Sequence, residues 1–400
     1  MSERSTRAGR FVQQGLGPDA FVPAPLPPDP PVEVNATMLA VLSEADRALG
    51  RLDGVIETIP SPDLFVAMYV RREAVLSSQI EGTQSTLDDL LTVELEPKAA
   101  GVPKDVDEIV NYVRAMNHGL ERLAHLPLSQ RLIREIHFEL MRSGRGSHRT
   151  PGEFRKIQNW LGPGEAPIER ATFVPPPVPE MRKALDDFEQ FLHDGALPAL
   201  IQVGLIHAQF ETIHPFLDGN GRVGRLLMTF MLVHRGVLKR PVLYLSHYLK
   251  LHRAEYYDRL SAIRQVGDWE GWMRFFLRGV AETATEATRT AQAIIRLRQH
   301  DRDLPQVQSS PNGARVLDLL FDRPLVNVNL VQQSLGVAYV TANSLIARFE
   351  DAGILTEITG NRRRRAFRYD GYLALFDEGP RAIGVAPRHT PFEAIGRDDR

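Results

Sequence analysis

Apolar side chains recur at three- and four-residue intervals along most of the chain, which is the spacing of one helix face. The clearest stripe consists of Phe65, Met68, Tyr69, Arg72, Val75, Leu76, Gln79 and Ile80. Gly82 stands where a C-cap would end that helix. The same periodicity predicts helices over 105–143, 179–193, 199–213, 222–234 and 254–300. We therefore expect a mainly α fold.

Two segments break the helical pattern. Residues 1–35 carry a run of prolines between Pro23 and Pro31, so we expect an irregular arm that lies extended over a domain surface. Residues 144–180 contain Gly, Pro and one short β-prone piece, Ala171 to Val174. This composition predicts a loop or a hairpin that projects from the helical body.

A different order of elements follows residue 305. Helices are expected at 314–321, 329–335 and 341–352, and strand-like pieces at 354–359 and 366–369. Three helices followed by a β-hairpin are typical of a winged helix-turn-helix. We therefore expect five parts: an extended arm (1–35), a helical region (36–104), a helical core (105–300), a winged helix-turn-helix (305–376) and a mobile tail (377–400).

Composition limits the chemistry and the location. The 400 residues include 48 basic and 50 acidic side chains, so charge alone indicates no global attraction to nucleic acid or membrane. There is no cysteine, which excludes disulfides, thiolate metal sites and a cysteine nucleophile. The start of the chain has no apolar leader, and the longest apolar stretch, Leu226 to Val233, is too short to span a bilayer. We expect a cytoplasmic protein with no membrane partner.

One run in the centre, ETIHPFLDGNGRVGR at 211–225, combines several chemical groups. Its glycines match G-x-G-x-x-G, but a helix is predicted before them, where a dinucleotide fold needs a strand. A helix, a glycine-rich loop and a second helix would instead direct backbone amides at an anion. Arg222 and Arg225 fall in the first turn of that second helix, where the helix dipole disfavours cations. A bound nucleoside polyphosphate would resolve this conflict.

Four further side chains, in the run or just before it, are candidates for catalysis or metal binding. Asp218 would hold Mg²⁺ beside bound phosphates, although Asp-Gly is also a common turn pair. His214 is presented at a helix end, where a general base near neutral pH is useful, or it is a structural histidine. His207, Glu211 and His214 share a helix face and resemble a zinc triad, but their spacing is not H-E-x-x-H.

The run from His214 to Arg225 resembles the signature H-P-F-x-D-G-N-G-R-x-x-R of the Fic family of nucleotidyltransferases at every defined position. Further similarity lies at 152–155 (GEFR), 172–176 (TFVPP), 256–257 (YY) and 267–270 (GDWE), so the resemblance covers about residues 20–300. It implies a Fic-type helical bundle with a small β-hairpin flap, followed here by the winged helix-turn-helix.

The resemblance also implies a reaction. A Fic enzyme of this type transfers AMP from ATP to a Tyr, Ser or Thr hydroxyl of target proteins, and often to itself, with release of pyrophosphate. His214 would be the base and Asp218 the Mg²⁺ ligand. The anion hole would consist of Gly219, Asn220 and Gly221, with Arg222 and Arg225 on the β- and γ-phosphates.

Two regions outside the motif would complete the substrate sites. Tyr257 matches the family's adenine-contacting tyrosine by position, although an aromatic residue in a helical core fits it equally well. The flap residues Thr172, Phe173 and Val174 would align an extended target segment by β-augmentation. A donor other than ATP, such as GTP, UTP or a CDP-linked alcohol, stays open because the phosphate motif does not read the base.

The apolar stripe helix ends in Ser77-Ser78-Gln79-Ile80-Glu81-Gly82, and Ser77 and Glu81 share one helix face. On spacing alone, a serine near a solvated glutamate is the simplest interpretation. However, S-x-x-x-E-G resembles the family's inhibitory motif. This resemblance implies that Glu81 pairs with Arg225 and leaves ATP bound unproductively.

The predicted hairpin near the C-terminus carries a cluster of basic residues: Arg362, Arg363, Arg364, Arg365 and Arg368. These side chains suit contact with DNA phosphates, or they are simply solvated, and the module suits dimerisation or target recruitment equally well. The second class of hypothesis is therefore a DNA-binding regulator whose Fic-like region senses a nucleotide without catalysis.

Overall fold

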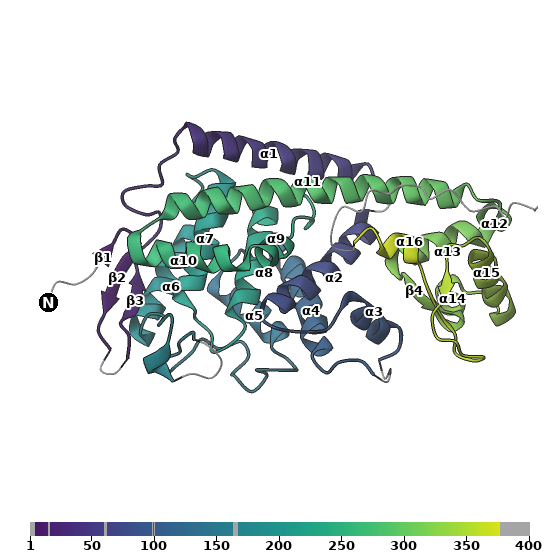
Figure 1. Cartoon of the computed structure of the whole chain (residues 1–400), viewed down its shortest axis with the longest axis horizontal. Helices are drawn as coiled ribbons and strands as arrows, with labels where there is room; N and C mark the ends of the chain where they lie inside the picture. The colour runs from purple at the N-terminus through teal and green to yellow at the C-terminus, as the bar shows by residue number, and fades with distance from the viewer. Residues whose placement is uncertain are drawn as a thin grey trace, which may run out of the picture.

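A computed structural model describes residues 5–14, 17–59, 62–97, 99, 101–162 and 167–376. The predicted mainly α architecture is confirmed, with small antiparallel sheets near the two ends of the described chain (Figure 1). The helices of the body are α1 (Ala36–Glu57), α2 (Pro62–Ile80), α3 (Leu87–Leu95), α4 (Val106–Leu123), α5 (Gln130–Leu140), the 3₁₀ turn η1 (Ile168–Arg170), α6 (Val178–Leu192), α7 (Ala199–Ile213), α8 (Asn220–His234), α9 (Ser246–Leu251), α10 (Arg253–Val266), α11 (Trp269–Arg302) and α12 (Pro305–Gln308).

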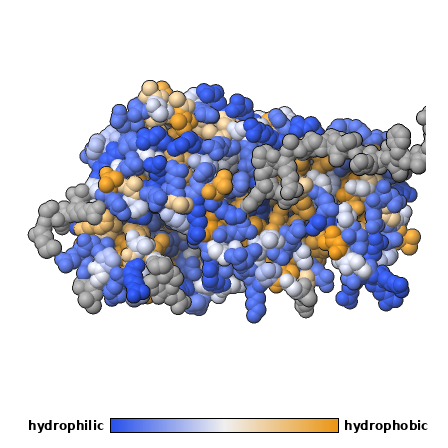
Figure 2. Space-filling view, viewed as in Figure 1, coloured by the Kyte–Doolittle hydropathy of each residue, from blue (hydrophilic) through white to orange (hydrophobic). Residues whose placement is uncertain are grey.

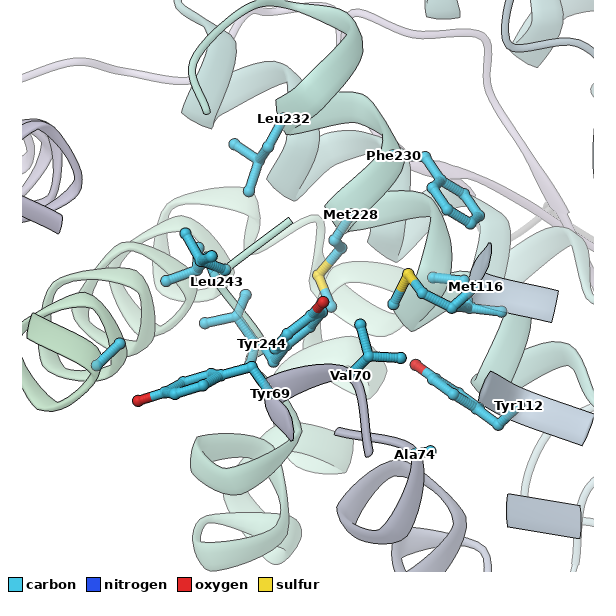
Figure 3. Close-up of a cluster of buried hydrophobic side chains, with 14 of the residues drawn as sticks. Tyr69, Val70, Ala74, Tyr112, Met116, Met228, Phe230, Leu232, Leu243 and Tyr244 are labelled. Atoms are coloured by element: carbon cyan, nitrogen blue, oxygen red, sulfur yellow. The ribbon is translucent and has the colours of Figure 1, made fainter. Parts of the chain in front are cut away.

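Helices α7 and α8 form the centre of the body. The sequence of α7, ALIQVGLIHAQFETI, is apolar on all sides, and nearly every residue of it is buried, as expected for a helix that other helices surround. Figure 3 shows side chains of α8, including Met228 and Phe230, meeting Val70 of α2 and Met116 of α4. This packing fixes α2 and α4 against α8, just C-terminal to the turns that carry the motif arginines.

Helices α1 and α11 lie side by side on one face of the body (Figure 1). They run in the same direction, and the amide of Glu33, just before α1, donates to the carboxylate of Glu270 at the start of α11 (2.9 Å). With 34 residues, α11 is about 50 Å long at 1.5 Å per residue. It therefore extends from the body to the C-terminal part of the chain. None of the helices in the described ranges is long and apolar enough to span a membrane.

The N-terminal segment differs from the irregular arm that the sequence predicted. Strands β1 (Ser5–Thr6), β2 (Gly9–Val12) and β3 (Ala20–Pro23) form an antiparallel sheet, and the residues between β3 and α1 belong to no strand. The proline run begins where β3 ends, so it does not interrupt the ladder. Phe11 and Phe21 meet edge to face at 5.0 Å, and the Phe21 amide donates to the carbonyl of Val174 (2.9 Å).

The C-terminal module, residues 311–376, contains the helices that periodicity predicted. Its elements are α13 (Pro311–Asp322), β4 (Leu325–Asn327), α14 (Val328–Leu335), α15 (Tyr339–Asp351), β5 (Thr356–Glu357), β6 (Ala366–Arg368) and α16 (Asp370–Leu373), and its sheet has the order β4-β6-β5. Strand β4 was not predicted, because three residues are too few to show a period. The winged helix-turn-helix stays a prediction, and the predicted mobile tail, 377–400, lies outside the described residues.

Candidate functional site

The motif loop between α7 and α8 is closed by its own side chains. Helix α7 ends at Ile213, and His214 takes a left-handed conformation with φ 48° and ψ 60°. The Asn220 side chain then accepts from the Phe216 amide and donates to the Phe216 carbonyl, both at 2.9 Å. Gly219, at φ 76°, makes the turn into α8. Asn220 therefore shapes the loop with its side chain, while the backbone amides at 219–221 begin the helix.

His214 begins the motif loop, directly after α7. Its Nδ1 atom is buried and has no hydrogen-bond partner within the described part of the chain. Its carbonyl accepts from Nε of Arg155 (3.1 Å), a fully buried guanidinium that also donates to the carbonyls of Ile157 and Pro176. Burial, together with the charge of Arg155, lowers the pKa of His214 to about 4. The imidazole is therefore neutral at pH 7 and able to accept a proton.

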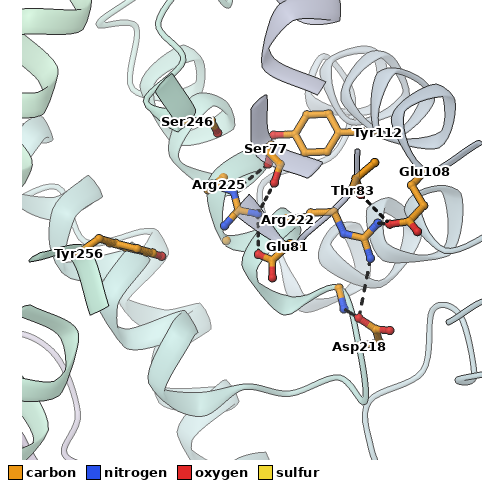
Figure 4. A network of polar contacts seen from close by, with 12 residues as sticks. Ser77, Glu81, Thr83, Glu108, Tyr112, Asp218, Arg222, Arg225, Ser246 and Tyr256 are labelled. Atoms are coloured by element: carbon orange, nitrogen blue, oxygen red, sulfur yellow. Dashed lines mark hydrogen bonds and ion pairs between the residues drawn. The ribbon is translucent and has the colours of Figure 1, made fainter. Parts of the chain in front are cut away.

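Arg225 is held by the end of α2 (Figure 4). Its Nη2 donates to Oε1 of Glu81 (2.7 Å) and to the carbonyl of Ser77 (3.0 Å), and its Nε donates to Oγ of Ser77 (2.7 Å). Burial alone would raise the pKa of Glu81, but the facing guanidinium outweighs burial and lowers it. The pair is therefore ionised, and it occupies the guanidinium that the resemblance assigns to a phosphate.

Arg222 lies almost fully buried beside a second carboxylate. Its Nη1 donates to Oε2 of Glu108 (3.1 Å), which also accepts from the hydroxyl of Thr83 (3.3 Å). Nη2 of Arg222 is 3.8 Å from Oδ1 of Asp218. The end of α2 and the turn after it thus reach both motif arginines. Glu81 binds Arg225 directly, and Thr83, two residues later, binds the carboxylate that holds Arg222.

Asp218 is the motif residue suited to a divalent cation. Its Oδ1 accepts from the amide of Gly219 (2.6 Å), while its side chain stays partly exposed. A Cβ at Gly146 would lie 2.4 Å from Oδ2, so the absence of a side chain there leaves that oxygen accessible. One carboxylate beside substrate phosphates fits Mg²⁺, which keeps several waters. Across the described residues, no three His, Asp or Glu side chains converge on a metal site.

The zinc interpretation of α7 is not supported by the contacts of His207. Its Nδ1 faces the carbonyl of Gly224 (3.1 Å), so this nitrogen carries the proton and donates. Its Nε2 then accepts from the hydroxyl of Tyr256 (2.9 Å). Both nitrogens are used. Glu211 is buried nearby, and burial raises the pKa of its carboxyl to about 7.

The predicted adenine and target residues lie at the edge of the site. Tyr257 is 40% exposed, and its ring lies 5.0 Å from that of Tyr256. In the flap, Thr172 is exposed and Phe173 pairs with Leu161 in a single β-bridge. Val174 is buried, and its carbonyl already accepts from Phe21. Among the three predicted flap residues, only Thr172 is exposed, because Phe173 is half-buried and its backbone is already bonded to Leu161.

Four functional neighbours were not found from the sequence: Glu73, Glu108, His137 and Arg155. Glu73 accepts from the hydroxyls of Tyr112 (3.1 Å) and Ser246, and burial raises its pKa to about 7. A signal existed for two of them. Glu73 precedes Ser77 and Glu81 by one and two helical turns, and Glu108 interrupts the apolar face of α4. No role for Arg155 followed from the GEFR run at 152–155, and nothing in the sequence indicated His137; most of the partners of these two residues are backbone groups far along the chain.

Comparison of the chain with known proteins identifies similar families and similar folds. The model described as "Fic/DOC family N-terminal" matches residues 39–121, and the model described as "Fic/DOC family" matches 127–232. Among curated proteins, the protein adenylyltransferase Fic of Drosophila virilis is 31% identical over 219 residues, which is 52% of this chain and 40% of that protein. The protein of the same name from Drosophila melanogaster is 30% identical over an equally long stretch. The chain thus spans about two fifths of the length of these relatives.

Two crystal structures share the fold. A Fic family protein from Desulfovibrio desulfuricans has a TM-score of 0.56 at 20% identity, and the match covers 85% of this chain and 97% of that one. A Fic domain containing signaling protein from Bacteroides thetaiotaomicron has a TM-score of 0.52 at 17% identity and covers 62% of this chain and 97% of its own. At these identities the likeness concerns the fold alone.

Proposed function

The chain belongs to the Fic/DOC family, and on that premise we propose that it is a protein adenylyltransferase kept inactive by Glu81. The activity would transfer AMP from ATP to a Tyr, Ser or Thr hydroxyl of a target protein. One observation carries the proposal: a complete motif, with neutral His214 and partly exposed Asp218 on the same loop. The name of the Drosophila relatives supports the same reaction.

The proposed step needs a base and neutralisation of charge. His214 accepts the hydroxyl proton while the hydroxyl oxygen forms a bond to the α-phosphorus. The bond from that phosphorus to the bridging oxygen breaks, and pyrophosphate leaves with the electron pair. The amides of Gly219, Asn220 and Gly221 would stabilise the developing charge. Asp218 would hold Mg²⁺, which neutralises phosphate charge when bound, and Tyr257 would contact the adenine.

Inhibition follows from the contacts of Arg225. A γ-phosphate that used this guanidinium would have to displace Glu81, whose hydrogen bond to it is charge-assisted and mostly shielded from water. Ser77 adds two more contacts that fix the arginine toward α2. ATP that enters without displacing Glu81 would lack this partner, so its α-phosphorus would not align with the incoming hydroxyl.

The test is mass spectrometry of the purified chain after incubation with Mg²⁺ and, separately, ATP, GTP, UTP and a CDP-linked alcohol. We expect an AMP adduct on the chain itself with ATP, at least about tenfold faster in Glu81→Gly because an ionic hydrogen bond contributes about 1.5–3 kcal/mol. Glu81→Gln, which keeps the size and removes the charge, should be intermediate. Adding His214→Ala to Glu81→Gly should abolish the adduct.

The outcomes separate the two parts of the proposal. Equal rates in wild type and Glu81→Gly would contradict inhibition by Glu81 and leave the transfer reaction standing. An adduct with another donor only would correct the substrate. No adduct from any donor or variant, on the chain or on proteins of a cell extract, would contradict the transfer reaction itself.

A further inference from the structure

The C-terminal module presents one helix face that is exposed over most of its length; at its end, Arg348 donates to Oγ of Ser309 (3.3 Å). Helix α14 ends at Gly336, which has φ 68°, and α15 begins three residues later at Tyr339. Leu345, Ile346 and Phe349 bury the inner face of α15 against the module. Its outer face is exposed and consists of Tyr339, Val340, Thr341, Asn343, Ser344, Ala347 and Arg348.

We propose that this module binds double-stranded DNA, with the outer face of α15 in the major groove and the β5–β6 hairpin on the phosphates. The inference goes beyond the proposed transfer reaction and does not depend on it. A short turn between two helices, the second of which is free on one side, is the arrangement that places a helix in the groove. The side chains of that face suit base edges. Asn343 can pair with adenine, and Val340, 78% exposed, can contact a thymine methyl.

The hairpin supplies the positive charge that the helix lacks. Arg362, Arg363 and Arg364 are exposed, and no carboxylate within the described residues pairs with them. Arg365, in contrast, donates to both oxygens of Glu350 near the end of α15 (3.0 and 3.1 Å), which holds the hairpin beside that helix. Of the five arginines predicted to contact DNA, the proposal therefore assigns the phosphates to Arg362, Arg363 and Arg364.

Arg368, the last arginine of the cluster, connects parts of the fold. Arg368 donates to Asp88 of α3 (3.2 Å) and to Asp370 (2.5 Å), so it joins the module to the body. The module as a whole has eight arginines against six acidic residues, whereas the full chain has two more acidic than basic residues. Positive charge thus gathers on the hairpin, as expected for a surface that meets a polyanion.

The position of α15 leaves room for a duplex. Figure 1 shows this helix at one end of the long axis, away from the sheet β1–β3 at the other end. Figure 2 shows hydrophilic residues along the lower edge of the same end. Three adjacent unpaired arginines beside a helix face rich in hydroxyl and amide groups favour a nucleic acid duplex over an apolar protein partner.

The test measures fluorescence anisotropy of a labelled 30-base-pair duplex with the full chain over a range of salt concentrations. The triple variant Arg362→Gln, Arg363→Gln, Arg364→Gln should bind at least about tenfold more weakly and flatten the log–log salt slope by about 2–3, because each phosphate contact contributes about 0.9. The matched control, Arg51→Gln, Arg114→Gln, Arg289→Gln, removes the same charge from exposed and unpaired arginines outside the module. It should bind as wild type does.

Three results would overturn the proposal: no duplex binding by wild type, the same loss of binding in the control triple variant, or equal affinity for a single strand of the same length. Base reading has its own measurement, which is selection of preferred sites from a randomised duplex pool. Asn343→Ala should weaken binding to the selected site by about 5- to 100-fold and leave binding to a random duplex unchanged. Selection that yields no preferred site would contradict docking of α15 in the major groove.

Discussion

A single imidazole, that of His137, connects three parts of the candidate site. Its Nδ1 accepts from the amide of Gly152 (2.8 Å), so its Nε2 carries the proton and donates to the carbonyl of Asp218 (3.1 Å). The ring also stacks on Phe216 at 3.7 Å. One fully buried side chain of α5 thereby fixes both the loop of the proposed metal ligand and the start of the flap segment.

This histidine predicts a pH dependence of stability. Burial lowers the pKa of His137 to about 4 in the folded chain, against about 6.5 when unfolded. The unfolded chain therefore binds more protons between these values, and stability falls as pH drops from about 6.5 to about 4, by about 1.4 kcal/mol per pH unit from this residue. In His137→Phe, urea unfolding should show a loss of about 2–4 kcal/mol at pH 7 from two unpaired backbone groups and a smaller further loss at pH 5.

The control for that prediction is His125→Phe, because His125 is exposed. This variant should keep the pH dependence of the wild type. If His137→Phe lost as much stability between pH 7 and pH 5 as the wild type does, the buried neutral imidazole would not be the source of the effect.

Site residues could be predicted from the sequence where their partners are close in the chain, and could not be predicted where their partners are far away in the chain. The run His214 to Arg225 could be read because its loop and helix start are contiguous and closed by Asn220. The roles of Arg155 and His137 could not, since most of their partners are carbonyls and amides 15 to 81 residues away. Glu81 was found through a resemblance, because its distance of 144 residues from Arg225 leaves no trace in spacing.

At the scale of elements, the end of α2 is fastened at several points. The amide of Gln84 donates to Asp105 (2.6 Å), and the hydroxyl of Ser85 donates to the same carboxylate. Arg145 donates to the carbonyl of Glu81 (3.1 Å). Thr86 then starts α3 with a capping box. These contacts hold Glu81 in register with Arg225, so inhibition depends on the turn as well as on the glutamate.

Loosening this turn should release part of the inhibition. In Asp105→Ala, the Gln84 amide and the Ser85 hydroxyl lose their charged acceptor, and we expect AMP transfer to rise about 3- to 10-fold, less than in Glu81→Gly. Asp107→Ala, two residues away and exposed, is the control and should leave the rate unchanged. Hydrogen exchange of residues 77–86 should accelerate in Asp105→Ala alone. Faster exchange without faster transfer would contradict a link between the turn and inhibition.

Periodicity predicted the helices well and the strands poorly, for a reason of length. Helices such as α4 and α11 present many turns of one face, whereas β1 and β4, which were not predicted, have two and three residues. Such strands form because a partner segment is brought alongside by the rest of the fold. Phe21 shows this, since its amide pairs with Val174 of the flap region, which lies 153 residues further along the chain.

At the scale of the whole molecule, α2 lies between the motif and the C-terminal module. Its last turn holds Arg225, and its first half faces the module, where the ring of Tyr69 meets that of Phe376 at 5.6 Å. Glu94 of α3 binds Arg71 of α2 (3.0 Å) and lies 3.8 Å from Arg323 of the module. We therefore expect that a displacement of the module shifts α2, which ends one residue before Glu81.

Weakening the contacts between the C-terminal module and α2 tests whether the module influences the pairing of Glu81 with Arg225. Glu94→Gln removes the charge shared by Arg71 and Arg323, and the free energy of unfolding should fall by about 1–2 kcal/mol because both pairs are only partly exposed. AMP transfer should rise about 2- to 5-fold, since a looser module lets α2 shift and Glu81 leave Arg225. Glu135→Gln is the matched control, because Glu135 also joins two arginines, Arg122 and Arg131, away from α2. If Glu94→Gln lowered stability but left transfer at the wild-type rate, while Glu81→Gly still raised it, the module would be docked on α2 without influencing the inhibitory contact.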